Sequence, residues 1–517
     1  MLDPREVRHR ACRSELLPGR HDALELARAW AGSTHLAVLR SGDAARPGGR
    51  WVLLGADPYL VFRSKRSACW AGPPGDERRL AGPPLVELAA ILARYRLPVE
   101  DDDGAAPRDL AFRGGALGYL GYELLYLLED IPDLGRDDLA VPDCYLLFFD
   151  TVVACDAETG AVAIVANGFG PSPGAARDHA GRRLAEVARR VRAVPRVGSE
   201  RGARPRPTRR RLSEPDLVAR GIHPVLPRAG YLNLIEAAKS HIRAGDIFEV
   251  CTCNRFDTTF TGSGFELFAA LQRVNPAPYS AYLRVPEVEV LSASPERFLT
   301  LDRERWVETR PMKGTRPRGR TPEEDREFAR QLAASEKDRA ENIMIVDLAR
   351  NDLGRVCEFG TVTVPDLQVV ESFAFTHQMV STVRGRLRDE CTAMDLIAAT
   401  FPGGSMTGAP KVEAMKIIDR LEPVKRGIFS GSIGYFDFDG MVGLNIVIRT
   451  FIKRGDSLSF HVGGAIVADS EAADEHQEIL DKAAGLVAAL DEYERVAGTA
   501  ASGMAGAAGA AVVERSS

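Results

Sequence analysis

A proline and a glycine three residues apart interrupt a strand-like run near the middle of the chain and restrict its backbone. Proline fixes φ at about −65° and glycine permits positive φ, so Pro311 and Gly314 predict a sharp turn with Lys313 at its tip. Most lysines at such positions are solvated surface residues. The alternative is a nucleophile, which must be a neutral amine with a pKa lowered from about 10.4 by burial or by cationic neighbours. Arg310 and Arg316 are close enough in sequence to lower it.

The charge balance excludes several classes of protein. The chain has 517 residues with 67 Lys and Arg against 72 Asp and Glu, a formal net charge of −5, so we expect no nucleic-acid partner. The short basic run at 209–211 is interpreted as solvated. We find no apolar run of about 18 residues and no apolar segment near the N-terminus, so we expect no membrane span and no signal peptide. The expected location is the cytoplasm.

The eight cysteines are scattered along the chain and form no Cys-x-x-Cys pair. Cys251 and Cys253 have the spacing of two residues on one face of a strand. Buried free thiols in a reducing compartment explain this pattern better than a metal site does.

The composition changes over residues 195–215, where Pro, Arg, Gly and Ser dominate, and we interpret this stretch as a linker or an exposed connection. We therefore expect an N-terminal domain over residues 1–215, which includes the linker, and a main domain over residues 228–496. The tail, residues 497–517, is rich in Ala, Gly and Ser and is expected to be disordered.

The main domain is expected to mix helices and strands. Apolar residues at helical spacing indicate helices over 231–244, 321–353, 394–400, 409–421 and 474–496. Alternating apolar residues indicate strands over 247–260, 431–438, 444–453 and 457–467, with a strand pair over 288–301.

Two pairs of carboxylates have the spacing that places both members on one face of a helix. Glu475 and Glu478 form one pair, and Asp338 and Glu341 form the other. Magnesium is bound by a few carboxylates, with water and ligand oxygens completing its shell, so both pairs are candidate magnesium ligands. The alternative is surface ion pairing with neighbouring cations, namely Lys337, Arg339 and Lys482.

Two glycine-rich loops are suited to binding anions through backbone N–H groups. The first covers residues 402–410 and opens a helix near Lys411, and helix N-termini bind carboxylates and phosphates. The second contains Gly463 and Gly464 as the chain leaves a strand. Arg449 ends another strand and can pair with a carboxylate through two hydrogen bonds. Together with the acids and Lys313, these loops indicate a small polyanionic substrate.

Four long motifs occur in order in the second half of the chain: residues 311–319, 338–354, 401–411 and 463–470. They resemble the chorismate-utilising enzymes, which include the first components of anthranilate synthase and aminodeoxychorismate synthase and the isochorismate and salicylate synthases. The resemblance covers roughly residues 228–495, and runs at 50–58 and 114–122 look like the family's N-terminal domain. It implies an α+β fold with large, mostly antiparallel β-sheets in a sandwich-like core and helices outside.

Lys313 distinguishes the branches of this family. Anthranilate synthases usually carry alanine at the matching position and aminodeoxychorismate synthases usually carry lysine. The runs 401–408 and 248–251 also resemble the aminodeoxychorismate type. The resemblance therefore implies component I of an aminodeoxychorismate synthase, which converts chorismate and ammonia to 4-amino-4-deoxychorismate for p-aminobenzoate and folate synthesis. The alternatives are anthranilate synthase component I, and a non-catalytic subunit that binds only chorismate or a partner.

The resemblance also implies roles for individual residues. Lys313 would add to C2 of chorismate while the 4-hydroxyl leaves, and Glu296 would protonate that leaving group, a role that needs a pKa raised by burial. Magnesium would be held by Glu341 and Glu478, with Glu475 and Asp338 nearby. The implied substrate-binding residues are Arg449, Ser405, Gly463, Gly464, Thr315 and Gln378. Many relatives have histidine at the last of these positions, and His377 is adjacent to it.

The implied partner is a separate glutamine amidotransferase subunit that supplies ammonia, because the chain contains no Gly-x-Cys-x-Gly nucleophile motif. The family's N-terminal domain can also bind tryptophan. The Leu-Leu-Glu-Ser signature of feedback-regulated anthranilate synthases is not evident, and the nearest run is Val38–Ser41. We therefore expect weak or no inhibition by tryptophan.

Overall fold

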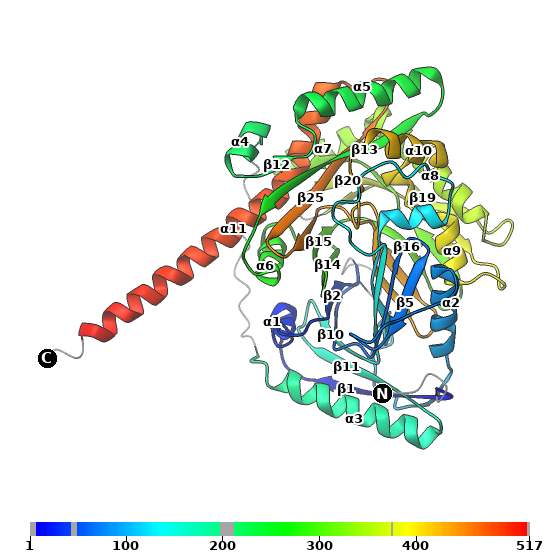
Figure 1. Cartoon of the computed structure of the whole chain (residues 1–517), viewed down its shortest axis with the longest axis vertical. Coiled ribbons are helices and arrows are strands. Elements are labelled where there is room, and N and C mark those ends of the chain that lie inside the picture. Colours follow the sequence, from blue (N-terminus) through cyan, green and yellow to red (C-terminus); the bar gives the residue numbers. More distant parts are fainter. Residues whose placement is uncertain (1–6, 43–48, 197–210, 374–375, 514–517) are drawn as a thin grey trace.

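The structure is a computed structural model that describes residues 7–42, 49–196, 211–373 and 376–513 (Figure 1). Side chains are described as far as residue 498. Two large β-sheets and a surrounding set of helices make up this part of the chain, so the fold is α+β, as the sequence predicted.

The first sheet has thirteen strands in the described residues, and all neighbours are antiparallel except for one parallel edge pair. Its strands, in spatial order, are β12 (His223–Pro224), β13 (Glu249–Thr259), β25 (Ser457–Ile466), β24 (Thr450–Arg454), β15 (Val288–Ser294), β14 (Tyr279–Val285), β2 (Leu36–Arg40), β3 (Trp51–Ala56), β10 (Thr151–Asp156), β11 (Val162–Gly170), β1 (His9–Leu17) and β7 (Val99–Asp102). A short strand, β21 (Gly408–Ala409), also pairs with β13.

The second sheet has twelve described strands, all antiparallel. In spatial order they are β18 (Met312–Pro317), β20 (Thr376–Arg386), β17 (Trp306–Thr309), β16 (Arg297–Leu301), β23 (Val442–Asn445), β22 (Ser432–Asp437), β8 (Gly115–Leu120), β9 (Cys144–Phe149), β4 (Leu60–Lys65), β5 (Ala68–Gly72) and β6 (Arg78–Arg79). Strand β19 (Thr363–Ser372) pairs with β20.

A hydrophobic core lies between the sheets. It joins Leu39 and Leu53 of the first sheet to Leu117, Leu147 and Ile433 of the second. These residues come from strands whose side chains alternate between two faces, so one face of each sheet is available for the shared core. The arrangement is the sandwich-like core that the sequence predicted.

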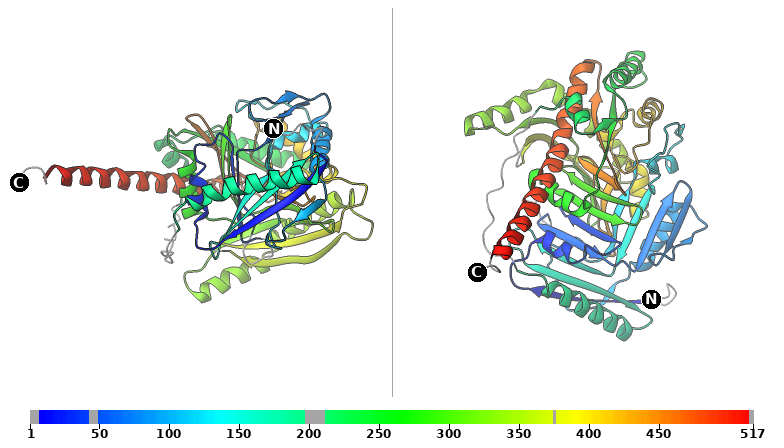
Figure 2. Two further views of the ribbon diagram at one scale, coloured as in Figure 1. Left: turned by 90° about the horizontal axis from the view of Figure 1, so that it is seen from below. Right: turned by 60° about the vertical axis from the view of Figure 1, so that its left-hand side comes forward.

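Helices cover the outer faces of both sheets (Figures 1 and 2). Those packed on the first sheet are α1 (Ala23–Arg28), α3 (Pro173–Arg192), α4 (Glu214–Ala219), α5 (Arg228–Ala244), α6 (Gly264–Val274), α10 (Lys411–Leu421) and α11 (Ala472–Val513). Those associated with the second sheet are α2 (Pro84–Tyr95), α7 (Pro322–Ala334), α8 (Glu336–Gly354) and α9 (Ala393–Thr400). Two 3₁₀ segments, η2 (Tyr122–Leu127) and η3 (Gly404–Met406), complete the described helices.

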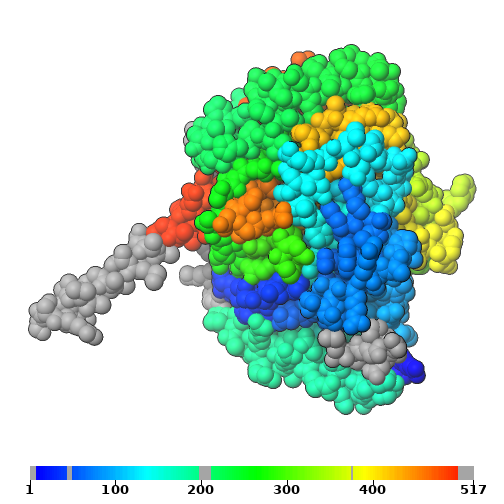
Figure 3. Space-filling view, in the orientation of Figure 1, coloured from blue at the N-terminus to red at the C-terminus, as the bar shows by residue number. Residues whose placement is uncertain are grey.

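Both sheets contain strands from each of the two parts expected from the sequence. In the first sheet, β2 pairs with β14, and in the second, β8 pairs with β22. Figure 3 shows this mixing on one face of the molecule, where segments of the first half lie against gold and orange segments beyond residue 400. Most of the expected linker, residues 197–210, lies outside the described residues, and the parts of the chain before and after it share both sheets.

Two predicted helical boundaries differ in the structure. The long helical region expected over 321–353 consists of two helices, because Ser335 ends α7 and its hydroxyl caps α8 by accepting the N–H of Asp338. Helix α11 continues past its expected end at residue 496 to Val513, which fits the high helix propensity of alanine, and the disorder expected of the tail over 497–517 stays a prediction. The last four residues of that tail lie outside the described residues.

The cysteine prediction is confirmed, because all eight are free and buried. In the described part of the chain, no helix is long and apolar enough to cross a membrane.

A buried ion pair fixes the loop between α9 and α10 to the first sheet. Arg426 donates to Glu422 at 2.7 and 2.8 Å and to the carbonyl oxygens of Met406 and Cys251, both at 2.7 Å. The N–H of Cys253 donates to Glu422 at 2.9 Å. Both charged residues are at most 6% exposed, so each depends on the other for neutralisation.

We expect Glu422→Gln to destabilise the protein by about 3–5 kcal/mol, since it leaves the Arg426 charge buried without a counter-ion. Thermal unfolding of the purified variant measures this loss. The matched control is Glu358→Gln, which breaks a half-exposed pair with Arg386 and should cost about 0–1 kcal/mol. Equal losses in the two variants would contradict the role assigned to the buried pair.

Candidate active site

Lys313 lies in strand β18 and not at the tip of a turn, so the predicted sharp turn is wrong. The pairing of β18 with β20 shifts register between Lys313 and Thr315, and Gly314 between them has a φ of 77°. This is a β-bulge, which uses a positive-φ glycine as a tight turn does. A Cβ at Gly314 would lie 2.8 Å from side-chain atoms of both Asp338 and Leu332, so glycine is also required for space.

The Lys313 side chain is only 10% exposed and is bound to an acid that the sequence analysis did not select. Its Nζ donates to Oε1 of Glu249, at the start of β13, over 2.6 Å. Burial favours a lower pKa for Lys313, but the carboxylates of Glu249 and Glu341 outweigh burial and raise the pKa above its usual range. The resting side chain is therefore an ammonium ion.

The expectation that Arg310 and Arg316 lower the pKa of Lys313 is wrong. Arg310 donates to Glu371 at 2.5 Å, and Arg316 forms an ion pair with Asp338 at 2.9 Å. Both guanidinium charges are thus balanced by acids of their own. Asp338, a candidate magnesium ligand in the sequence, is the partner of Arg316 in this arrangement.

Glu296 lies between β15 and β16 and is 7% exposed. The side chain of Ser405 and the backbone of Met312 lie close enough to favour its charged form. Burial raises the pKa of Glu296 to about 7, while Ser405 and the nearby charges of Lys313 and Arg449 limit the rise. The structure thereby brings together four residues that the sequence selected, and Glu296 has the acidity that a proton donor needs near neutral pH.

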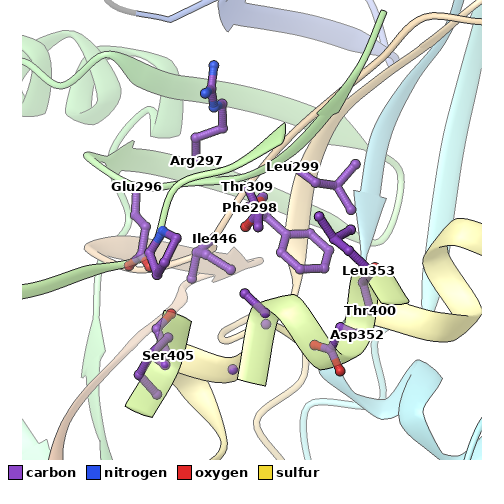
Figure 4. A pocket seen from close by; sticks show the side chains of 15 residues that line it. Glu296, Arg297, Phe298, Leu299, Thr309, Asp352, Leu353, Thr400, Ser405 and Ile446 are labelled. Atoms are coloured by element: carbon purple, nitrogen blue, oxygen red, sulfur yellow. The ribbon is translucent and has the colours of Figure 1, made fainter. Parts of the chain in front are cut away.

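A cavity extends from Glu296 into the space between α8 and the second sheet (Figure 4). Glu296 and Ser405 lie at one side of it and Asp352 and Thr400 at the other, and Arg297 points away (Figure 4). The remaining lining is mainly apolar and includes Phe298, Leu299, Ile345, Leu353 and Ile446.

Arg449 immediately precedes β24 and has a φ of 53°, a left-handed conformation that non-glycine residues rarely adopt. Its carbonyl oxygen accepts the N–H of Ala293 at 3.1 Å, which holds the strand end against β15. This geometry places the charge of Arg449 close enough to Glu296 to affect its pKa.

Glu475 and Glu478 of α11 meet Gly464 of β25. A Cβ at Gly464 would lie 3.2 Å from Oε2 of Glu475 and 3.9 Å from Oε1 of Glu478, so the glycine leaves room for both acids. Burial and the charge of Glu478 raise the pKa of Glu475, although the Ser470 hydroxyl donates to it at 2.6 Å.

Two of the three cations expected to pair with these acids, as the alternative to metal binding, do so, whereas Arg339 donates to the side chain of Gln368 at 3.0 Å. Lys482 donates to Glu478 at 2.8 Å and to the carbonyl oxygen of Gly463 at 2.7 Å. Lys337 lies 4.0 Å from Glu341 and also lowers the pKa of both Glu475 and Glu478. Lys337 is therefore a cationic neighbour of all three carboxylates, those of Glu341, Glu475 and Glu478, and Lys482 is a cationic neighbour of the last two.

The chemistry of these carboxylates fits a hard cation such as magnesium, which prefers carboxylate oxygens. Like-charge repulsion between Glu475 and Glu478 calls for positive charge, which Lys337 and Lys482 supply here. Within the described residues, no three His, Cys, Asp or Glu side chains converge closely enough to form a metal site by themselves. Substrate oxygens would have to complete the coordination.

Gln378 and Thr315 are paired across strands β20 and β18. Gln378 is 5% exposed, and its side-chain oxygen has no hydrogen-bond partner in the part of the chain that the structure describes. The adjacent His377 lies 2.9 Å from Asp325 and from the Ser372 hydroxyl, so its ring already has partners on both nitrogens. Gln378 is therefore better able than His377 to bind a substrate.

The run Val38–Ser41 lies in and just after β2. Leu39, Arg40 and Ser41 line a second cavity between the sheets, with Tyr279 and Asn445 on its other sides. This is the region in which the sequence analysis sought a feedback signature, and weak tryptophan inhibition stays a prediction.

The family model described as chorismate binding enzyme matches residues 45–488. The chain belongs to this family. It is 38% identical over 469 residues to aminodeoxychorismate synthase component 1 of Salmonella typhimurium, which covers 90% of this chain and 95% of that protein. It is 42% identical over 421 residues to the aminodeoxychorismate synthase of Streptomyces pristinaespiralis, with 80% of this chain covered.

The chain spans about half of that Streptomyces relative, since the match covers 55% of its length. Among solved structures, anthranilate synthase component I from Streptococcus pneumoniae superposes with a TM-score of 0.69 at 28% identity, covering 84% of this chain and 92% of that one. The family's fold and the relation of this chain to both synthase types are thereby established.

Proposed function

We propose that this family member is the chorismate-aminating component of an aminodeoxychorismate synthase, which forms 4-amino-4-deoxychorismate from chorismate and ammonia. The observation that carries this proposal is that a buried lysine, Lys313, lies close enough to Glu296 to affect the pKa of that carboxyl, so a lysine and a proton donor share one buried site. Relatives of this name at 38% and 42% identity support it.

The proposed reaction uses the chain's own residues in two displacements. Lys313 adds to C2 as the 4-hydroxyl leaves, and Glu296, whose pKa is about 7, donates the proton that turns this group into water. Ammonia then attacks C4 and expels the lysine. Arg449, Ser405 and Gln378 orient the substrate by binding its polar groups.

Glu341, Glu475 and Glu478 are the residues that would hold magnesium near the backbone of Gly463 and Gly464. When bound, magnesium supplies positive charge that orients and neutralises a substrate carboxylate. Without that charge, the three acids would repel a dianionic substrate.

We further infer that a glutamine amidotransferase partner delivers the ammonia, because the Salmonella relative is named component 1 and ammonia is consumed. The product would serve p-aminobenzoate and folate synthesis. A reducing cytoplasm is the compartment that fits eight free, buried thiols.

A second candidate is anthranilate synthase component I, favoured by the raised pKa of Lys313. An ammonium ion cannot attack C2, so ammonia would reach that carbon instead. The purified protein with chorismate, magnesium and an ammonium salt at mildly alkaline pH distinguishes the two. Aminodeoxychorismate, identified by mass spectrometry and by conversion to p-aminobenzoate with added lyase, supports the proposal. Fluorescent anthranilate as the main product would refute it.

Removal of magnesium with a chelator is expected to abolish turnover, and added magnesium should restore it. Glu478→Gln removes one proposed ligand and should raise the magnesium concentration needed for half-maximal rate by about 10-fold or more. The matched control is Glu492→Gln on the same helix, which pairs with Arg273 and Arg495 away from the site. If Glu478→Gln and Glu492→Gln needed the same magnesium concentration for half-maximal rate, the role of Glu478 as a magnesium ligand would be contradicted.

A further inference from the structure

Glu249 is a buried acid that the proposed reaction does not yet use. It is 0% exposed, and its Oε1 lies 2.6 Å from Nζ of Lys313. Its second oxygen, Oε2, is buried without a hydrogen-bond partner among the described residues. A buried carboxylate with one unsatisfied oxygen is costly, and protonation of that carboxylate would remove its charge.

The backbone holds Glu249 in place from two sides. It begins β13, pairs with Ala409 of β21, and follows Phe248, whose N–H donates to the Ala409 carbonyl oxygen at 2.7 Å. Gly408 has a φ of 152° and no room for a side chain against the Glu249 carbonyl oxygen. The carboxylate is thus positioned by paired strands, which are more rigid than a loop.

Lys313 must lose a proton before it can attack, and few groups are placed to take it. Glu249 and Cys251 of β13, Glu341 of α8 and Glu478 of α11 contribute to its electrostatic surroundings, and Lys313 in turn affects Glu296. Among the described acidic residues, Glu249 alone lies within 4.0 Å of the Lys313 nitrogen.

We propose that Glu249 is the proton acceptor for Lys313, which converts the resting ammonium ion into the amine that attacks chorismate. This inference rests on the proposed function. Transfer of one proton over the existing hydrogen bond turns two buried charges into two neutral groups, so no isolated charge is created. The hydrogen bond that stabilises Lys313 as an ammonium ion is thus also the path by which Lys313 loses its proton and becomes a nucleophile.

The proton balance closes over one turnover. An N–H bond of Lys313 breaks and an O–H bond forms on Glu249. The N–C2 bond then forms while the C4–O bond breaks, and the proton of Glu296 leaves with that oxygen as water. Attack of ammonia at C4 breaks the N–C2 bond and releases the neutral amine, which recovers its proton from Glu249. The ammonium group formed at C4 returns a proton to Glu296.

The test is Glu249→Gln, which keeps the size of the side chain and its hydrogen-bonding oxygen but cannot accept the proton. Without ammonia, the wild-type protein should accumulate an adduct on Lys313 with the mass of chorismate less one water. Rapid quenching followed by intact mass spectrometry measures how fast this adduct forms. We expect adduct formation in Glu249→Gln to be about 100-fold slower near neutral pH and to accelerate as pH rises.

The two possible roles of Glu249 predict opposite results. Its charge raises the pKa of Lys313, so a carboxylate that acted only as a counter-ion would suppress the amine, and its removal would speed adduct formation. An unchanged or faster rate in Glu249→Gln therefore overturns the proposal. A control, Glu289→Gln, removes another carboxylate paired with a lysine, Lys453, and should leave the rate unchanged.

Glu249→Asp keeps the charge and shortens the side chain by one methylene, so it tests the contact if the glutamine variant does not fold. Adduct formation at least about 10-fold slower than in wild type supports the proposal, and a wild-type rate overturns it. If the wild-type protein forms no adduct and makes anthranilate, the proposed function fails and the role of Glu249 fails with it. If wild type forms the adduct and Glu249→Gln does so equally fast, only the role of Glu249 fails.

Discussion

Lys313→Ala is expected to lower the rate of amination at C4 by on the order of 10⁶-fold, the scale on which loss of the serine nucleophile acts in a serine hydrolase. The shortened side chain also leaves space beside C2, so ammonia can attack there and anthranilate should appear as a side product. Steady-state assays that quantify both products by mass spectrometry and fluorescence measure the change. A variant with the wild-type rate and product would show that Lys313 has no covalent role.

The alanine variant also leaves Glu249 buried without its counter-ion, which destabilises the fold independently of catalysis. Two matched variants separate these effects. Lys313→Arg keeps a positive charge for Glu249 but is permanently protonated, so it should be as inactive as alanine while restoring stability. The double variant with Lys313→Ala and Glu249→Gln removes both charges and should also restore stability without restoring amination at C4.

Glu296→Gln is expected to lower kcat by roughly 10²–10⁴-fold, because glutamine cannot protonate the departing 4-hydroxyl. The change in KM should be smaller, since the amide keeps most of the side chain's contacts. The control is Glu308→Gln, which breaks the ion pair of Glu308 with Arg297, whose side chain points away from the cavity (Figure 4). Similar losses in the two variants would contradict the role of Glu296.

The pH dependence of the wild-type rate should reflect the titration of Glu296. The pKa of Glu296 is about 7, raised chiefly by burial, and the residue must be protonated to act as an acid. Therefore kcat/KM for chorismate should be high below pH 7 and fall about tenfold per pH unit above pH 7. This decline should be absent in Glu296→Gln, because its side chain does not titrate.

The sequence selects most residues of the candidate site because they lie in local motifs. Glu296, Ser405 and Lys313 were each selected from short runs, and the structure brings them together through strands and a 3₁₀ segment. Gly464 was chosen as a backbone anion site, and the structure adds that its missing Cβ leaves room for Glu475.

The errors about charge share one cause, which is that local sequence does not show which distant side chain neutralises a charge. Arg310 and Arg316 looked like the neighbours of Lys313, but each pairs with an acid brought by another element. Glu249 is 64 positions from Lys313 in the chain and belongs to the other sheet. The sequence around Glu249, residues 248–251, indicates only the enzyme type.

The sequence by itself determined the fold class, the family motifs and the identity of the nucleophile and acid candidates, because each depends on residues close together in the chain. Tertiary structure alone determined that strands from both halves share each sheet, and that a bulge rather than a turn directs Lys313 toward Glu249. Strand alternation indicates which residues face a core but not which strands pair. The charge state of Lys313 depends on that pairing, because it places the lysine against a buried carboxylate.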